Sequence, residues 1–550
     1  MDYLWWYVPV ATAPMLIAFI ATVHVFVSHY AVGGGIFLAA ETQWAHKQEN
    51  KKYLDYLKSH AKFFVLLTVV FGAITGVGIW WTIALASPLA TETLIRTFVF
   101  GWGTEWVFFV LELAAAFFFY YLWDRLSPRN HTIMGWIYAL AAWISLVLIT
   151  GITAFMLDPG KWPELTQAGT QGTAFWTGFF NPQFLPQTIA RTGAALLLAS
   201  SYVLFHASIF TGEDAELKTL VVRRSVRYIL AGVALAVIGA AWSGAILSDA
   251  ARMAMLRAAA LNIILGAGAG AAGMLVLLLL LLVWKPKWLT PVAGVAVLLA
   301  SFGVLTAGEF VREALRKPYV LVNCVYGNQI HVSQVAKLRE TGLLENGRWT
   351  KEYMAEKFPY VVDSATGKLN LDLVRPEDAN AVGEVIFMHH CNDCHARTLG
   401  YNGLSLLSTS ARKGELKELL LNLDSMIYYM PPWCGTEKEA ELLAGYLESI
   451  AEPHPAAGSV GTTLPASLNE EGSTSAQSPT HAAQTDDAGS VLPEKEETSS
   501  PQIPTEAAQT DDAESVVPEK EETSSPQIPT EAAQTDDAGS VVPEKEGGAQ

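Results

Sequence analysis

Eight long apolar segments recur between Tyr3 and Val311, and they constrain the fold more than any other feature of this sequence. Each contains roughly the 20 apolar residues that an α-helix needs to cross ~30 Å of hydrocarbon. Backbone groups inside lipid must pair within their own segment, so we predict membrane-spanning helices and not strands. The segments are residues 10–38, 62–86, 98–122, 133–157, 187–210, 227–248, 258–284 and 290–311.

The connections between these segments differ in charge. Those on one side of the predicted bundle carry 13 lysines and arginines, and those on the other side carry four. The positive-inside rule places the richer side in the cytoplasm. We therefore expect a multi-pass protein of the bacterial inner (cytoplasmic) membrane with its amino terminus on the periplasmic side. Because the number of spans is even, the carboxyl-terminal region is expected on the periplasmic side too.

The acidity of the chain belongs to its last 100 residues. The chain has 53 acidic and 36 basic side chains, and 20 of the acids but only three lysines lie in residues 451–550. Residues 1–450 are therefore neutral overall, and 51% of the whole chain is hydrophobic. This charge and composition exclude a nucleic-acid-binding protein, a small disulfide scaffold and a soluble enzyme. Residues 453–550 repeat with a period of 25 and have few large apolar side chains, which predicts a disordered tail.

Between the last span and the tail, the composition is that of a soluble region. Residues 383–390 and 437–450 have an amphipathic helical pattern. The predicted fold class is all-α: a polytopic bundle of about eight helices, a small helical domain and a disordered tail. The predicted parts are a transmembrane domain (1–317), a linker or periplasmic extension (318–380), the small domain (381–452) and the tail (453–550).

Residues 391–395 read Cys-Asn-Asp-Cys-His, the attachment sequence of a c-type haem. Thioethers to Cys391 and Cys394 would fix the porphyrin, and His395 would be the proximal ligand. Met430, held by two following prolines, is the expected sixth ligand. The alternatives are a zinc site, which wants further ligands, and a redox-active Cys pair, which has no use for the histidine. We predict one covalent haem c, which makes the small domain a class I cytochrome c domain.

Ionisable side chains inside the predicted spans are costly and are therefore functional candidates. Glu105 and Glu112 are seven residues apart and share a helix face. His24 and His29 are five residues apart, ~140° around a helix, so we expect a haem ligand at His24 and a structural hydrogen bond at His29.

Further charges and imidazoles lie near the ends of the spans. The last span ends in two pairs at i,i+4 spacing, for which an interfacial position is the alternative to a functional one: Glu309/Glu313 and Arg312/Arg316. Three histidines near the inner ends are expected to be interfacial: His60, His131 and His206.

In these residues the membrane region resembles the haem-bearing large subunit of cytochrome bd quinol oxidases, over roughly residues 10–320. The motifs that carry the resemblance are His24 with Gly33 nine residues later, FGAITG at 71–76, TEWVFFVLE at 104–112, NP at 181–182 and AGEFVREALRKP at 307–318.

The resemblance implies one or two non-covalent haems of b and/or d type. It implies that His24 is an axial ligand in a high-spin di-haem site and that Glu313 is the ligand of the other haem there, supported by Arg316. It also implies that Glu105 and Glu112 are the acidic pair at the haem and the proton path.

Three departures from that family concern electron entry. Arg191 and Ile264 stand where the family has the two ligands of a low-spin haem b. The outer loop that handles quinol in the family is reduced to about residues 247–257. The family's ninth span is missing, and the haem c motif follows the eighth span instead.

These features predict a membrane-bound respiratory haem protein, a bd-like terminal oxidase subunit. It would take electrons from a periplasmic cytochrome or other redox protein, pass them through haem c to the membrane haems and reduce O₂. Other membrane subunits and the lipid bilayer are expected partners, and nucleic acid is not. The alternative is a non-catalytic electron-transfer subunit that links quinone or another redox enzyme to periplasmic cytochromes. A haem or redox sensor is a third possibility, for which we see no output domain.

Overall fold

The computed structural model describes residues 6–167, 171–212, 214–248, 251–252, 255, 259–347, 349–398, 400, 402–408, 414–427 and 429–451. All of these residues belong to one compact unit, Met1–Gly461. The predicted tail with its 25-residue repeats lies outside the described residues, as does most of the shortened loop at residues 247–257.

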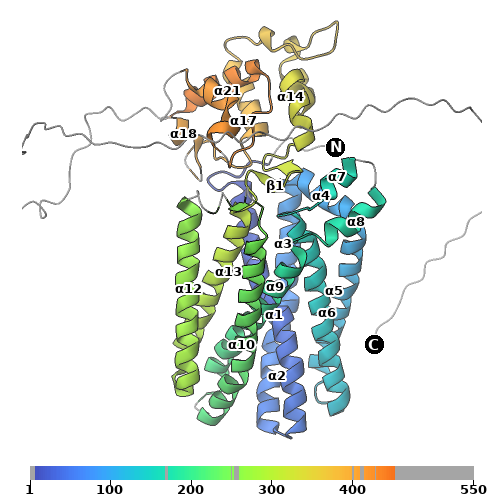
Figure 1. Cartoon of the computed structure of the whole chain (residues 1–550), viewed down its shortest axis with the longest axis vertical. Coiled ribbons are helices and arrows are strands. Elements are labelled where there is room, and N and C mark those ends of the chain that lie inside the picture. Colours follow the sequence, from blue (N-terminus) through green and yellow to red (C-terminus); the bar gives the residue numbers. More distant parts are fainter. Residues whose placement is uncertain are drawn as a thin grey trace, which may run out of the picture. The chain divides into compact units, whose positions relative to one another are not determined.

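Eight described helices are long and apolar enough to cross a membrane, and each coincides with a predicted segment (Figure 1). The predicted helical membrane bundle is therefore confirmed. The helices are α1 Ala13–Lys47, the continuous run of α2 Lys51–Val65, the π-helical η1 Leu66–Phe71 and α3 Gly72–Ala86, then α5 Val99–Tyr121, α6 Pro128–Phe155, α9 Phe184–Phe210, α10 Ala215–Ala245, α12 Ala259–Trp284 and α13 Pro291–Ala314. Most of them extend beyond the apolar segment into polar residues, because capping groups and not the edge of the apolar run decide where a helix begins.

Capping side chains start four of these helices. Asn50, Ser127, Asp214 and Thr290 each accept a hydrogen bond from the backbone N–H three residues later. Each of these bonds pairs one of the N–H groups that the first helical turn leaves free. Ser127 and Thr290 are also followed by proline, which is tolerated in the first turn.

Short helices connect the spans on the side of the soluble region: α4 Pro88–Thr97, α7 Trp162–Gln167 and α8 Gln171–Phe179. The amide of Asn181, between α8 and α9, donates to the carbonyls of Gly151, Gly178 and Phe179. This buried side chain ties the start of α9 to the end of α6.

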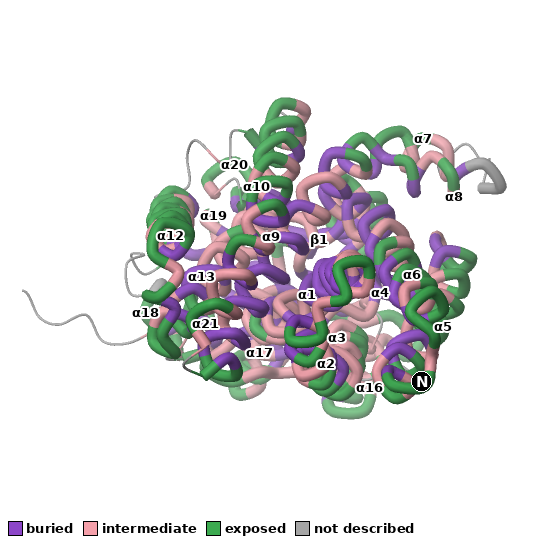
Figure 2. The backbone as a smooth tube through the Cα atoms, turned by 90° about the horizontal axis from the view of Figure 1, so that it is seen from below, coloured by how far each residue is buried: buried purple, intermediate pink, exposed green. Residues whose placement is uncertain are grey.

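Helix α9 is the most enclosed element of the bundle. It packs against α1, α6, α10 and α13, and Figure 2 shows α9 and α1 largely buried while α12 and α5 are more exposed. A Cβ at Gly193 would collide with the backbone of α10, and one at Gly232 would collide with the backbone of α9. Glycine is therefore required at this seam, as is common where membrane helices approach closely.

The region after α13 begins with two short antiparallel strands, β1 Tyr319–Leu321 and β2 Val325–Tyr326, which were not predicted. Leu321 and Val325 share a core with Phe98 and Phe155 of the membrane bundle. The remaining helices are α14 Val335–Thr341, α15 Leu343–Asn346, α16 Thr350–Lys357, α17 Ala379–His390, α18 Leu404–Leu407, α19 Leu416–Leu421, α20 Leu423–Met426 and α21 Glu437–Ile450, with single 3₁₀ turns η2 Pro286–Trp288, η3 Val332–Gln334, η4 Pro359–Val361 and η5 Leu371–Leu373.

Helices α17 and α21 cross closely and organise the soluble core. A Cβ at Gly383 would lie 2.5 Å from the carbonyl oxygen of Leu442 and 2.6 Å from the Cβ of Tyr446. Thr436 and Glu439 form a capping box at the start of α21, at the predicted residue. The core contains residues from 330–361 as well as 382–447, so side chains of the predicted linker pack together with those of the small domain.

Candidate functional site

The Cys-x-x-Cys-His motif lies where α17 ends. The backbone N–H of Cys391 still bonds to Phe387, and the N–H groups of Cys394 and His395 both bond to the carbonyl of Cys391. This turn brings the two thiols and the imidazole onto one short loop. Both thiols are free and partly buried.

The His395 ring is oriented by a backbone group. Its Nδ1 lies 2.8 Å from the carbonyl oxygen of Asn402, and since a carbonyl only accepts, Nδ1 carries the proton and donates. The Nε2 lone pair is then free for a ligand, which is how histidines that bind metal are usually held. Asn402 has a positive φ of 49°, a conformation that asparagine tolerates better than most residues. Nothing in the spacing of the sequence pointed to Asn402.

Met430 lies on a loop that Trp433 anchors. The Trp433 side chain is 2% exposed, its Nε1 donates to the carbonyl of Thr436 at 3.1 Å, and its own carbonyl accepts from Arg339 at 2.8 Å. Met430 and Cys391 both pack against the same soluble core. The loop is therefore anchored at two points: Met430 packs against the soluble core, and Trp433 is buried and hydrogen-bonded.

The environment of the thiols bears on the alternatives to haem. Burial raises the pKa of Cys391 to about 12 and also raises the pKa of Cys394. Redox-active Cys-x-x-Cys pairs instead have a lowered thiol pKa. Among the described residues, no three His, Cys, Asp or Glu side chains are grouped to hold a metal ion.

His389 and His390, just before the motif, are buried in different contacts. The His390 ring is 6% exposed and lies 4.9 Å from the ring of Trp433, and His389 stacks on Trp349. Burial lowers the pKa of His390 to about 3. His389 also borders a pocket of about 340 Å³ that none of the predicted ligands lines.

The acidic and basic side chains at the end of α13 form ion pairs with each other at i,i+3 spacing. Glu309 pairs with Arg312 at 2.9 Å, and Glu313 pairs closely with Arg316. The Arg316 side chain is 4% exposed and also donates to the carbonyl of Val320 at 2.7 Å. Arg316 is thus buried and does not reach out to an interface.

Lys317 is a residue of this site that the sequence did not single out. Its Nζ lies 3.7 Å from Oε1 of Glu313. The position that a Cβ would take at Gly327 lies 3.9 Å from the same Nζ and 3.6 Å from the sulfur of Cys394. The ammonium group of Lys317 therefore lies close to the Glu313 carboxylate and on the same side of Gly327 as the sulfur of Cys394.

The charge on Lys317 also acts on the motif itself. Burial raises the pKa of Asp393 to about 7, and Lys317 opposes that rise. Burial lowers the pKa of His395, the Asn402 carbonyl raises it, and Lys317 lowers it further. The soluble motif and the end of α13 thus share one cation.

His24 lies next to the π-helical turn η1. Its Nδ1 is 3.0 Å from Oγ1 of Thr75, whose own hydrogen is directed to the carbonyls of Phe71 and Gly72. His24 therefore donates from Nδ1 and keeps Nε2 as a free lone pair. A Cβ at Gly76 would lie 3.2 Å from the imidazole, so glycine makes room for the ring. No hydrogen bond or ion pair joins His24 to Glu313 in the described part of the chain.

His29 has other neighbours, as its angular offset predicts. The side chain is 5% exposed, and Nδ1 donates to the carbonyl of Val25 at 3.1 Å. It interacts electrostatically with Arg191 and Glu309, and Arg191 interacts with Glu309 and Arg312. Arg191 is therefore part of a charged cluster with His29, Glu309 and Arg312.

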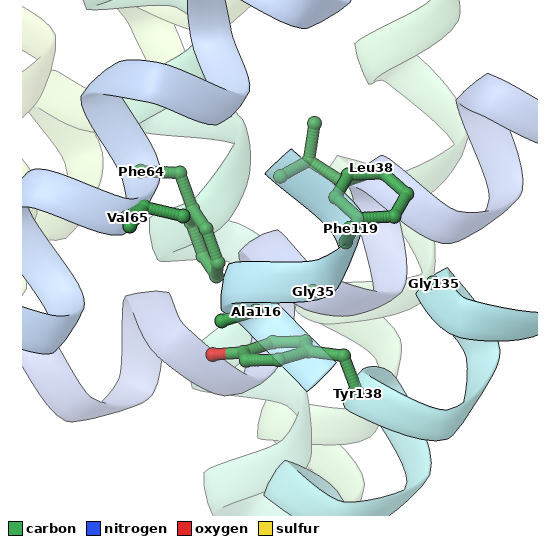
Figure 3. Close-up of a pocket in the computed structure, with 8 residues that line it drawn as sticks. All are labelled: Gly35, Leu38, Phe64, Val65, Ala116, Phe119, Gly135 and Tyr138. Carbon is green, nitrogen blue, oxygen red and sulfur yellow. The ribbon is translucent and has the colours of Figure 1, made fainter. Parts of the chain in front are cut away.

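Glu105 and Glu112 both face α6. Ser145 donates to Glu105 at 2.8 Å, and Tyr138 donates to Glu112 at 2.9 Å. Tyr138 and Ser145 are also seven residues apart, and they lie on α6, which runs antiparallel to α5. This matching spacing could have identified both residues in the sequence. The cavity beside Tyr138 is apolar and has a volume of about 10 Å³, at the lower limit for one water molecule (Figure 3).

The three histidines expected at the inner interface are enclosed by the protein itself. His60 and His131 are fully buried, and His206 is 1% exposed. His60 lies 3.1 Å from the hydroxyl of Tyr30 and 4.8 Å, between ring centroids, from His206. Contacts between helices, which residue counting along one span does not reveal, bury these rings.

Comparisons with known proteins give a family match and a similar solved structure. The family described as cytochrome bd terminal oxidase subunit I matches residues 13–267. The structure of bd oxidase from Geobacillus thermodenitrificans is similar at 15% identity, over 57% of this chain and 89% of that chain, with a TM-score of 0.48. No curated protein matches. Residues 13–267, from α1 into α12, are thus similar to subunit I of cytochrome bd terminal oxidases, and the match ends before α13 and the soluble region.

Proposed function

We propose that this chain is a bd-like respiratory oxidase subunit that receives electrons on the periplasmic side. A haem c held by Cys391, Cys394, His395 and Met430 in residues 381–452 takes electrons from a periplasmic cytochrome or similar redox protein. The chain passes them to one or two non-covalent haems in the bundle, where O₂ is reduced. The family match over residues 13–267 supports the oxidase part of this proposal.

The observation that carries the proposal is the short route from the Cys-x-x-Cys-His motif to the end of α13. The Nζ of Lys317 lies 3.7 Å from Oε1 of Glu313, and both this Nζ and the sulfur of Cys394 lie within 4 Å of the position that a Cβ would take at Gly327. Electron transfer between two cofactors needs this kind of proximity. The proximity of Glu313 and Cys394 to the same lysine supports direct transfer between the haems that these residues are proposed to hold.

The residues fit the groups they are proposed to hold. His395 and His24 each donate from Nδ1 and present Nε2, and Gly76 leaves space beside His24. Glu313 would supply the second membrane ligand while Arg316 fixes its carboxylate. The bound haems supply one-electron carriers, and four electrons with four protons convert one O₂ into two waters. Glu105 and Glu112, oriented by Ser145 and Tyr138, are proposed to hold protons for that reaction.

The charged cluster around Arg191 supports entry through haem c. Arg191 stands at a family ligand position for low-spin haem, and its guanidinium interacts with Glu309 and Arg312. Because arginine stays protonated and has no lone pair to give, it does not serve as an iron ligand. Electrons from an external donor then need another route to the membrane haems, and we propose that they enter through the haem c motif.

Spectroscopy and turnover on the purified chain test this function. We expect a pyridine haemochrome spectrum with one c-type haem and at least one b- or d-type haem, a CO difference signal, and O₂ consumption with reduced cytochrome c. His395→Ala and Met430→Ala should abolish that turnover and leave the membrane haem spectrum unchanged. A haem set that binds neither CO nor cyanide would instead favour the non-catalytic electron-transfer subunit.

A further inference from the structure

Lys317 lies just beyond the end of α13 but is not among the proposed haem ligands. It follows Arg316 directly after α13 and precedes the β1–β2 hairpin, so it lies at the junction between the membrane bundle and the soluble region. Its side chain is 26% exposed, and that of its partner Glu313 is 24% exposed. Water therefore screens this pair less than it screens a fully exposed one.

The ammonium group interacts with both sides of the junction. On the membrane side it is 3.7 Å from Oε1 of Glu313, whose other oxygen pairs with Arg316. On the soluble side, this Nζ and the sulfur of Cys394 lie 3.9 Å and 3.6 Å from the position that a Cβ would take at Gly327. Neutral hydrogen bonds also cross the junction, such as Ala90 N–H to Gln329 at 3.3 Å and Val322 N–H to Met156 at 3.2 Å.

We propose that Lys317 is the positioning residue for electron transfer between the two parts of the chain. Its single positive charge holds the Cys-x-x-Cys-His loop against the end of α13 and sets the potential at which that loop's haem accepts an electron. The inference rests on the proposed function, because it assigns a role within the same electron route.

The direction of the electrostatic effect follows from the charge. A cation beside an iron centre stabilises the state that has gained an electron, so it raises the reduction potential. Removing the cation lowers the potential of haem c and leaves Glu313 with Arg316 alone. Each transfer moves one electron from the soluble iron to the membrane iron, and no bond is formed or broken.

Two substitutions separate charge from shape. Lys317→Gln keeps most of the side-chain length but loses the charge, and Lys317→Arg keeps the charge. The matched control is Lys337→Gln, at an exposed position on α14 of the same soluble region. Full-length protein with all haems is used, and haem content is measured first.

The readouts are the reduction potential of haem c, by spectroelectrochemistry, and the rate of electron transfer between haems after CO photolysis of partly reduced protein. After photolysis the electron returns from the membrane haem to haem c. Lys317→Gln should lower the potential of haem c, which disfavours this return, and should slow it by about fivefold, the effect of an ion pair at the upper end of the exposed range. Lys317→Arg should restore both values, and Lys337→Gln should change neither.

The inference is overturned if Lys317→Gln transfers electrons at the wild-type rate and potential, or if Lys317→Arg behaves like Lys317→Gln. These outcomes differ from a failure of the proposed function. If wild-type protein shows no transfer between haems at all, the proposed function itself is wrong. If wild-type protein transfers electrons and the variants do too, only the role of Lys317 is rejected.

Discussion

The crossing of α17 and α21 leads to a prediction that can be worked out from atomic distances. Changing Gly383 to alanine places a methyl group 2.5 Å from the Leu442 carbonyl oxygen and 2.6 Å from the Tyr446 Cβ. Both atoms are fixed to the backbone, so the helices must separate. Overpacking of this kind costs about 1–3 kcal/mol, and the better helix propensity of alanine offsets ~0.5–1 kcal/mol of that cost. We expect a net loss of about 1–2 kcal/mol in local stability.

Amide hydrogen exchange on the full-length protein in detergent measures this loss. Local opening of α17 and α21 should become roughly 5–30-fold more frequent in Gly383→Ala, so exchange in peptides from both helices accelerates. The matched control is Gly445→Ala on the exposed face of α21, where a Cβ meets nothing within 4 Å. That variant should exchange more slowly than wild type. If both variants slow exchange alike, the two helices do not touch at Gly383 and the reasoning is refuted.

Three further predictions concern other parts of the chain. Glu41 is fully buried and binds Tyr53, Arg224, Arg227 and Tyr228. Glu41→Gln should therefore lower the stability of the bundle by about 3–5 kcal/mol, because two arginines lose their counter-charge. Unfolding in SDS measures this loss, and an unchanged unfolding midpoint contradicts the prediction. Burial lowers the pKa of His390 from 6.5 to about 3. At a pH between these two values the unfolded chain binds a proton that the folded chain does not, so the soluble core should lose stability as the pH falls from 6.5 toward 3. Guanidinium titrations at pH 7 and 5 should show the loss, and His390→Gln should reduce it. His24→Ala should lose a membrane haem and keep haem c, as judged by the pyridine haemochrome ratio; retention of every membrane haem argues against ligation by His24.

The sequence predicts the bundle well because its signal is local. Each apolar segment contains its own hydrogen-bonding partners, so length and hydropathy suffice to identify it. The amphipathic pattern places α21 at the residues where the structure has it. The β1–β2 hairpin escaped notice because its strands are three and two residues long, too short for any periodicity.

The candidate site could be predicted only in part. Motif spacing identifies Cys391 and His395, but the groups that orient them come from elsewhere in the chain. Asn402 acts through a backbone carbonyl, which any residue possesses, so its identity contains no signal. Lys317 follows a charged helix end and has the pattern of an ordinary interfacial cation; only the fold brings Lys317 and Cys394 to the same side of Gly327. The same limitation explains why His60 was expected at an interface.

The enclosure of α9 has a consequence for how this protein can diverge. In α9, 72% of the most apolar window is buried inside the protein, although its mean hydropathy is only 1.6; in Leu261–Trp284 of α12 the values are 11% and 2.4. Contact with lipid is compatible with any apolar side chain on α12, whereas the close contact between α9 and α10 accommodates only small residues. A saturation mutagenesis screen should therefore find α12 permissive toward exchange among leucine, isoleucine and phenylalanine and find α9 intolerant of the same exchanges at its small residues.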